Sequence, residues 1–338
     1  MNGSRMAAEM AEQPEVLAGL AARRSDVREA IRTVVPESLA GIVLIARGSS
    51  DHAAVYGRYV LEAASGRPVA LAAPSLHTLY GATVDYDGYL AVAVSQSGRT
   101  PEIVTVLERA SAGGARTIAI TNDLGSPLAQ GADAAFDLRA GEERAVPATK
   151  TFTAQVAAFA LLAEALGRVP WTDEDWRTLP DAVGWVLQDD EPPAAVARGI
   201  GTAAGLITVG RGYVFAIALE VALKLKETTG LPAQGYSAAD LRHGAIAVVE
   251  RGFPVLALSP AGPAERDVAE LVGELEGRGA RVFLAAEGQG DLPVRPGLAE
   301  PLQAIPMAVR GQQVAHQLAL LRGLDPDAPP GLSKVTMT

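Results

Sequence analysis

A short polar loop at residues 95–100 has the composition of an anion-binding site: it reads Ser-Gln-Ser-Gly-Arg-Thr and lies between an apolar run and a proline. Backbone N–H groups in the first turn of a helix lack partners within the helix, and the helix dipole is positive there, so both attract anions. Gly98 lets the backbone approach a ligand closely. The loop is therefore predicted to bind a phosphate monoester, with a serine-capped polar turn as the alternative. A serine pair, Ser49 and Ser50, follows an earlier strand and is predicted to lie at the same edge of the sheet.

A second group of reactive side chains has helical spacing. Glu220, Lys224 and Glu227 fall on one face of a helix, and the residues among them are largely apolar. A solvated salt-bridge stripe has the same spacing and is the simpler interpretation. If the helix is buried, a carboxylate beside a lysine becomes a candidate acid–base pair with shifted pKa values.

The four histidines are scattered along the chain. His243 precedes a glycine and is either a turn residue or a catalytic one. His52 lies next to the serine pair and is a further candidate, whereas His77 and His316 are interpreted as structural. Because no short ligand spacing links the four, no metal site is expected.

The elements that must position these groups occur twice. Residues 42–48 read Ile-Val-Leu-Ile-Ala-Arg-Gly, and residues 206–212 read Leu-Ile-Thr-Val-Gly-Arg-Gly. The strand at 90–95 has its counterpart at 254–259, at the same offset. The second copy continues as Pro-Ala-Gly-Pro-Ala at 260–264, which offers a ligand almost nothing. We interpret the chain as two divergent halves that share one site.

Near-continuous apolar runs that alternate with helical stretches are typical of a parallel sheet covered on both faces. The predicted fold class is α/β, with two tandem doubly wound, flavodoxin-like domains. Strands are predicted at 42–46, 68–72, 89–94, 117–121, 205–209, 254–258 and 281–285. Helices are predicted at 4–33, 51–64, 101–112, 149–167, 214–229, 264–277 and 311–322, with turns at 171–181 and a linker at 191–193. The predicted parts are a helical lead (1–38), two domains (39–190 and 191–324) and a C-terminal tail (325–338) that is ordered only if it packs on something.

Composition narrows the functional classes. The chain has 338 residues, of which 49% are hydrophobic and 20% charged, as expected for a globular protein with two domains. Its net charge of −10 and the lack of a basic run argue against nucleic-acid binding. The absence of cysteine excludes disulfides and thiolate chemistry. No membrane span or signal peptide is recognised, so a cytoplasmic location without membrane contact is expected.

The chain resembles the double sugar-isomerase-domain (SIS) family, which includes the isomerase half of glutamine:fructose-6-phosphate amidotransferase and stand-alone glucosamine-6-phosphate deaminases. The resemblance covers nearly the whole chain, and its motifs identify the family far better than the reaction. It implies a phosphosugar substrate, no cofactor and a homodimer with a shared site. The matching segments are Arg47-Gly-Ser-Ser50, the loop at 95–100, Ala148-Thr-Lys-Thr-Phe-Thr153, Ala222-Leu-Lys-Leu-Lys-Glu227, Leu241-Arg-His-Gly244 and Leu332-Ser-Lys-Val335.

The same resemblance implies residue roles. Glu227 would move a proton between C2 and C1, with Lys224 beside it. His243 would assist ring opening from a second subunit, and Lys334 would close over the sugar. The residues implied to bind the substrate are Ser49, Ser50, Ser95, Gln96, Ser97, Thr100 and Val146.

Three departures bear on the reaction. The glutaminase half of the amidotransferase has no counterpart in this sequence, so amination of fructose 6-phosphate is not expected. Arg99 fits the deaminase pattern, and Ala148 stands where the amidotransferase has a serine. The predicted function is conversion of glucosamine 6-phosphate to fructose 6-phosphate and ammonia. Dehydration of N-acetylglucosamine 6-phosphate, plain aldose–ketose isomerisation and a non-enzymatic phosphosugar sensor stay open as alternatives.

Overall fold

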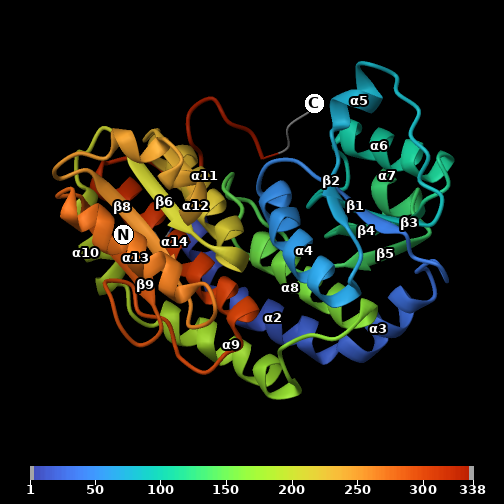
Figure 1. Ribbon diagram of the computed structural model, residues 1–338, viewed down its shortest axis with the longest axis horizontal. Helices are drawn as coiled ribbons and strands as arrows, with labels where there is room; N and C mark the ends of the chain where they lie inside the picture. Colours follow the sequence, from blue (N-terminus) through green and yellow to red (C-terminus); the bar gives the residue numbers. More distant parts are fainter. Residues whose placement is uncertain (1–3, 335–338) are drawn as a thin grey trace. The chain divides into compact units, whose positions relative to one another are not determined.

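The computed structural model describes residues 4–334, which fall into two compact units, each built around one parallel sheet (Figure 1). The N-sheet unit comprises residues Val16–Glu142 and Ala154–Pro170. The C-sheet unit comprises the residues up to Glu15, Glu143–Thr153 and Trp171–Lys334. The prediction of two parallel α/β sheets is confirmed, while the predicted boundaries at residues 39, 191 and 325 stay predictions.

The N-sheet unit holds five parallel strands in the order β2-β1-β3-β4-β5. Strand order reverses between β1 and β3, and ligands of open α/β sheets bind at such a switch point, outside the carboxyl ends of the strands. The serine pair and the loop at 95–100 follow these two strands. The strands are β1 (Gly41–Ile45), β2 (Val69–Leu71), β3 (Tyr89–Val94), β4 (Arg116–Thr121) and β5 (Ala134–Asp137).

Helices cover both faces of this sheet (Figure 1). Ile103, Val106 and Leu107 of α6 (Pro101–Ala112) pack in one core with Val43 and Ile45 of β1. The opposite face carries α4 (Ser49–Ser65), which packs against α8 (Lys150–Leu166). Shorter or peripheral helices are α2 (Gln13–Ala22), α3 (Arg24–Arg32), α5 (Pro74–Thr78) and α7 (Pro127–Gln130).

The C-sheet unit repeats this plan with four parallel strands in the order β7-β6-β8-β9. Its switch point lies between β6 and β8. The strands are β6 (Leu206–Gly210), β7 (Ala233–Ser237), β8 (Pro254–Ser259) and β9 (Arg281–Ala286). The helices around them are α11 (Phe215–Thr229), α12 (Ala238–Arg242), α13 (Glu265–Gly277) and the largely buried α14 (Glu300–Leu321), with 3-10 turns at Gly212–Val214 and Ala245–Val248.

Several predicted elements were wrong. The stretch predicted as helical at 4–33 is indeed helical, but it is divided into three helices, α1 (Arg5–Ala11), α2 and α3. The predicted turns at 171–181 belong to α9 (Asp173–Leu187), which begins with a capping box between Thr172 and Asp175. The predicted linker at 191–193 is the first turn of α10 (Glu191–Ile200), where proline is tolerated because its missing N–H has no helical partner. The last helix begins at Glu300 rather than at 311.

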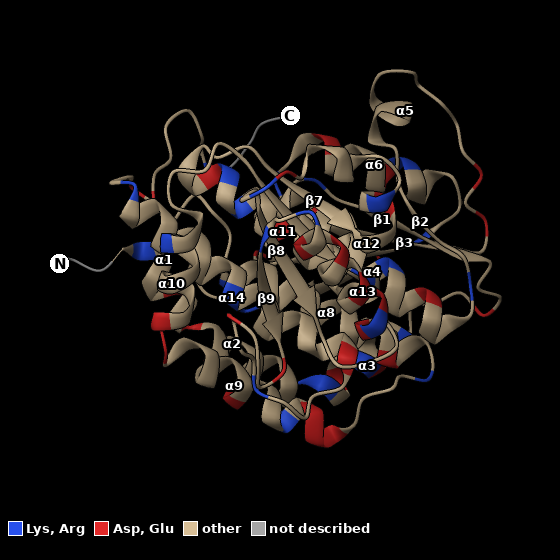
Figure 2. Ribbon diagram, turned by 60° about the vertical axis from the view of Figure 1, so that its left-hand side comes forward, with Lys and Arg blue, Asp and Glu red and all other residues tan. Residues whose placement is uncertain are grey.

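Figure 2 shows acidic and basic residues interspersed along helices such as α3 rather than gathered in a basic stripe. Among residues 4–334, no helix combines the length and the apolar composition needed to span a membrane.

Candidate active site

The loop at 95–100 is held in a conformation that only glycine permits at its centre. Gly98 has a φ of +61°, and a Cβ atom there would lie 2.1 Å from Oγ of Ser126. The Gly98 carbonyl accepts a hydrogen bond from Leu128 N–H (3.1 Å), and the Gln96 carbonyl accepts one from Asn122 N–H (3.1 Å). The loop is therefore fixed to the segment that follows β4.

The serine hydroxyls of this loop are oriented as donors. Ser95 Oγ accepts a hydrogen bond from Gly98 N–H (3.2 Å), and Ser97 Oγ accepts one from Arg99 N–H (3.3 Å). Because each oxygen is already an acceptor, its hydrogen is directed elsewhere. Thr100 occupies the N-cap of α6 and, within residues 4–334, its side chain does not cap the helix. Hydroxyls and first-turn amides are the kinds of donor that bind anions at helix N-termini.

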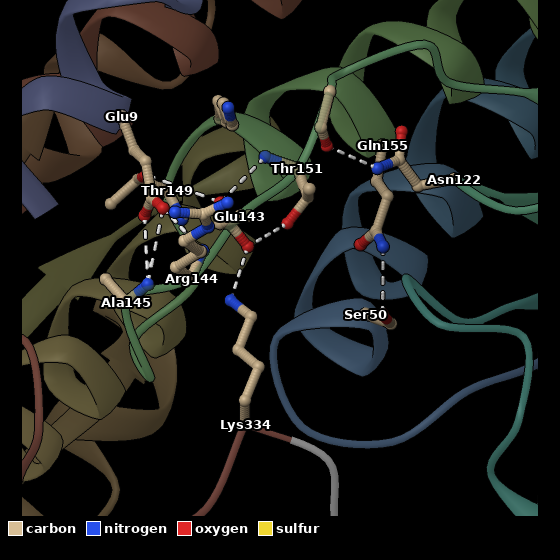
Figure 3. Close-up of polar contacts among 12 residues, drawn as sticks. Glu9, Ser50, Asn122, Glu143, Arg144, Ala145, Thr149, Thr151, Gln155 and Lys334 are labelled. Atoms are coloured by element: carbon tan, nitrogen blue, oxygen red, sulfur yellow. Dashed lines mark hydrogen bonds and ion pairs between the residues drawn. The ribbon is translucent and has the colours of Figure 1, made fainter. Parts of the chain in front are cut away.

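The serine pair, Ser49 and Ser50, begins α4, which follows β1, the strand next to β3 in the sheet. Gly48 is the N-cap of this helix, so no side chain caps its first turn within the described chain. Ser50 is buried and accepts a hydrogen bond from Nε2 of Gln155 on α8 (3.0 Å; Figure 3). Ser49 and His52 are half-buried in the first turn of the helix. Both predicted serine groups thus lie at the carboxyl ends of adjacent strands, as expected.

The charged residues of α11 form a buried cluster in the C-sheet unit. Lys224 and Glu220 are each 1% exposed. Lys224 Nζ lies 2.5 Å from Glu227 Oε2 and 3.3 Å from Glu220 Oε1. The alternative of a solvated salt-bridge stripe is therefore wrong.

This arrangement shifts the pKa values of both partners upward. Burial disfavours the charged form of Lys224, but Glu220 and Glu227 together outweigh it and raise the pKa of the lysine. Burial also raises the pKa of Glu227; Lys224 opposes this shift and Glu220 adds to it. A carboxylate with a raised pKa is a stronger base, which suits proton abstraction from carbon near neutral pH.

A second buried carboxylate, Glu143, receives the C-terminal tail (Figure 3). Lys334 Nζ lies 2.7 Å from Glu143 Oε2. The same carboxylate accepts hydrogen bonds from Thr149 N–H (2.9 Å), Thr151 N–H (3.1 Å) and Thr151 Oγ1 (2.6 Å), at the beginning of α8. Burial favours the neutral acid, but Lys334 and the threonine donors outweigh it and lower the pKa of Glu143. The charge of Lys334 also lowers the pKa of Glu227.

The tail has a further anchor at Asp327. Its carboxylate accepts hydrogen bonds from Arg5 N–H (2.7 Å) and Met6 N–H (2.8 Å) in the first turn of α1. Its carbonyl accepts one from Val146 N–H (2.9 Å). Val146, a predicted substrate-binding residue, is thereby attached to the described part of the tail, residues 325–334, which also contacts α1 and Glu143. Val335 of the tail motif lies outside the described residues.

The histidines occupy different settings. His243 is exposed at the C-cap of α12, and its proposed action in a second subunit stays a prediction. His77 and His316 are buried and hydrogen-bond with Tyr86 and Ser4. Among residues 4–334, no three or more histidine, aspartate or glutamate side chains are grouped so that they could hold a metal ion.

The equivalent loop of the C-sheet unit, residues 260–264, is approached by two carboxylates from other segments of the chain. Glu287 accepts a hydrogen bond from Ala261 N–H. The Glu300 carboxylate lies against Gly262, where a Cβ atom would be 2.4 Å from Oε2. Burial raises the pKa of both acids. The loop at 260–264 therefore differs from the loop at 95–100 in its surroundings as well as in its own residues.

Sequence analysis did not identify two residues that contact predicted site residues: Glu143, which pairs with Lys334, and Gln155, which donates to Ser50. Glu143 stands in a short polar stretch without helical or strand periodicity, and nothing in its spacing links it to Lys334. Gln155 did carry a signal, because it is a lone amide in a nearly all-apolar helix. Polar groups at such positions are buried and need a partner.

The chain is similar in sequence to known proteins of one family. The model of the SIS domain family matches residues 40–165 and 202–289. An isomerizing glutamine–fructose-6-phosphate aminotransferase of Methanothermobacter thermautotrophicus is 34% identical over 87% of this chain and 51% of its own length. The corresponding enzyme of Halobacterium salinarum is 34% identical over 97% of this chain and 58% of its own length. The chain thus spans about half the length of these curated relatives.

Solved structures have the same fold. A Silicibacter pomeroyi protein, provisionally described as a phosphosugar isomerase, is 35% identical, with a TM-score of 0.85 over 96% of this chain and all of its own. A glucosamine-6-phosphate deaminase of Thermotoga maritima has a TM-score of 0.80 at 24% identity, over 99% of this chain and all of its own. The latter likeness is one of fold alone.

Proposed function

Because the chain belongs to the SIS domain family, we propose that it acts on a phosphosugar and converts glucosamine 6-phosphate to fructose 6-phosphate and ammonia. The observation that carries the proposal is the buried cluster on α11, where Glu227 lies 2.5 Å from Lys224 and has a raised pKa. Phosphate binding alone does not require a base. A proton transfer at carbon does.

The donors at 95–100 and in the first turn of α4 suit the 6-phosphate. Serine hydroxyls that already accept from the protein direct their hydrogens to a ligand, and two uncapped helix N-termini favour its charge. Binding energy from the phosphate, which does not react, orients the sugar for the chemical step.

The chemical step follows from the basic carboxylate. In the open-chain sugar, the C1 aldehyde acidifies the proton on C2. Glu227 removes that proton while O1 takes a proton from solvent, which gives an enolamine. Glu227 then returns its proton to C1, and the nitrogen gives one proton back to solvent, which leaves an imine at C2. Water adds to the imine and releases ammonia and fructose 6-phosphate. Lys224, fixed between two carboxylates, holds Glu227 in place, and the tail residue Lys334 adds positive charge near it.

The exposed position of His243 suits action in a second copy of the chain, so we propose a homodimer in which it assists ring opening. Co-expression of Glu227→Gln and His243→Ala chains tests this. If the histidine acts across subunits, mixed dimers contain one intact site and regain activity that neither variant has alone. Failure of a verified mixed dimer to regain activity would place His243 in its own subunit's site.

The direct test offers purified protein glucosamine 6-phosphate and N-acetylglucosamine 6-phosphate separately. Ammonia and fructose 6-phosphate in equal amounts from the first establish the deaminase. A product lighter by one water from the second, without ammonia from the first, identifies a dehydratase and overturns the proposal. Binding of either sugar phosphate without turnover in both the parent and Glu227→Gln would instead identify a sensor.

A further inference from the structure

Gln155 is a buried amide that contacts one of the serines of the predicted binding site. It is 1% exposed, its Nε2 donates to the buried Ser50 Oγ at 3.0 Å, and its Oε1 has no hydrogen-bond partner among the described residues. Both residues belong to the N-sheet unit, on α8 and α4. A buried acceptor without a partner is disfavoured and calls for an explanation. Gln303 shares this property, so what distinguishes Gln155 is its hydrogen bond to Ser50 in the first turn of α4.

The direction of this hydrogen bond determines what Ser50 can do. A serine hydroxyl has one hydrogen and two acceptor positions. Because Gln155 donates to it, Ser50 Oγ is an acceptor within the protein, and its hydrogen is directed toward another group. Ser95 and Ser97 are in the same state, since backbone N–H groups donate to them.

We propose that Gln155 is a positioning residue that fixes the Ser50 hydroxyl as a donor to an anionic phosphosugar at the first turn of α4. The inference rests on the proposed function, because it takes a sugar phosphate as the ligand. Ser50 has no backbone N–H donor of the kind that orients Ser95 and Ser97 among the described contacts. A side chain from α8 supplies it instead.

Substitutions at 155 separate this role from mere packing. Gln155→Met keeps the size of the side chain and removes the donor, which leaves the Ser50 hydroxyl unoriented. Gln155→Glu keeps the shape but can only accept, so Ser50 would donate to the introduced carboxylate rather than to the ligand. The glutamate variant should therefore bind an anion more weakly than the methionine variant does.

The test measures the dissociation constant for glucosamine 6-phosphate by calorimetry in the Glu227→Gln background, where the sugar is not turned over. Gln155→Met and Ser50→Ala should each weaken binding about tenfold, and the double variant should be no weaker than either single one. Multiplicative losses, or no loss with Gln155→Met, would overturn the inference. So would a Gln155→Glu variant that binds as tightly as the parent.

Gln303→Met is the matched control. Gln303 is also a fully buried glutamine whose Nε2 donates to the protein and whose Oε1 lacks a partner among the described residues, but it lies on α14 beside Glu287. Its substitution should leave the dissociation constant unchanged. Gln155→Asn, which withdraws the amide by one methylene, replaces Gln155→Met if that variant does not fold.

If the Glu227→Gln parent binds neither the sugar nor inorganic phosphate, the proposed function fails and this inference falls with it. Parental binding with indifferent Gln155 variants refutes this inference alone.

Discussion

Lys334 and Glu143, 191 residues apart in the chain, form a 2.7 Å ion pair whose carboxylate is fully buried and whose lysine is the last residue described. The same carboxylate accepts the backbone N–H groups of Thr149 and Thr151 where α8 begins. One side chain therefore holds both the tail and a helix terminus. The position of Lys334 is coupled to the ionisation of Glu143.

Lys334→Met should invert the pH dependence of stability. In the parent, the pKa of Glu143 is below its ordinary value of 4.5, so its stabilising effect is complete above that value and is lost as pH falls through the lowered pKa. Without Lys334, burial dominates and the folded pKa rises above the unfolded one. Stability should then fall as pH increases through that raised value, by about 1.4 kcal/mol for each unit of separation. Urea unfolding across a pH series measures this, with the exposed Lys226→Met as control. Parallel curves for the parent and Lys334→Met would contradict the coupling.

Glu227→Gln should abolish catalysis and retain binding. The amide keeps the shape of the side chain but cannot take the C2 proton, and general bases contribute about 10²–10⁴-fold to rates. The expected result is a fall in kcat of that order with an unchanged dissociation constant for the phosphosugar. Steady-state assays and calorimetry measure the two. Glu276→Gln, at an exposed position of α13, is the control. Parental turnover by Glu227→Gln would refute the assignment of the base.

Lys224→Met should move the acidic limb of the pH–rate profile to higher pH. The catalytic base must be ionised, so activity falls as pH decreases through the pKa of Glu227, which is above its ordinary value. Lys224 lowers that pKa, and its removal raises it further. Loss of one partner from a buried pair also costs about 3–5 kcal/mol of stability. The profile of kcat/KM is compared at a temperature where both proteins are folded. A shift of the limb to lower pH would show that Lys224 does not stabilise the ionised base.

Gly98→Ala should disrupt the loop far more than an equivalent change elsewhere. Gly98 and Gly66 have nearly the same φ, +61° and +63°, so alanine costs about 1–2 kcal/mol in backbone strain at either. Only at Gly98 does the new Cβ clash, with Ser126, which adds about 1–3 kcal/mol. Urea unfolding and phosphosugar binding should both weaken for Gly98→Ala, whereas Gly66→Ala, at the C-cap of α4, should affect stability alone. Equal effects in both assays would mean that the loop tolerates a side chain at its centre.

The sequence predicts the central strands well and the marginal ones poorly, for a physical reason. The runs at β1 and β3 are buried on both faces, so they are continuously apolar. β5 and β7 were missed because they lie at sheet edges and carry residues such as Asp137 and Gln234 that partly face solvent. α9 was missed because its start is polar and because a proline, Pro180, lies inside it. The capping interaction of Thr172 with Asp175 does not depend on apolar periodicity.

The site divides in the same way between local and distant groups. The loop at 95–100 and the cluster on α11 each consist of residues close together in the chain, so residue types and spacing identified both as candidates. Spacing alone did not separate the α11 cluster from a solvated salt-bridge stripe. The pairs of Lys334 with Glu143 and of Gln155 with Ser50 join residues 191 and 105 positions apart. No spacing rule relates such residues, because the fold brings them together.

The carboxylates at the switch point of the C-sheet unit limit how the two halves could be engineered. Transplanting Ser-Gln-Ser-Gly-Arg-Thr onto residues 259–264 would not by itself create a second phosphate site. Glu287 already takes the Ala261 amide, and Glu300 lies against Gly262, so an incoming phosphate would meet negative charge. The two carboxylates would compete with a phosphate for the backbone N–H groups of this loop. A symmetrised protein with two working loops would have to replace both glutamates first.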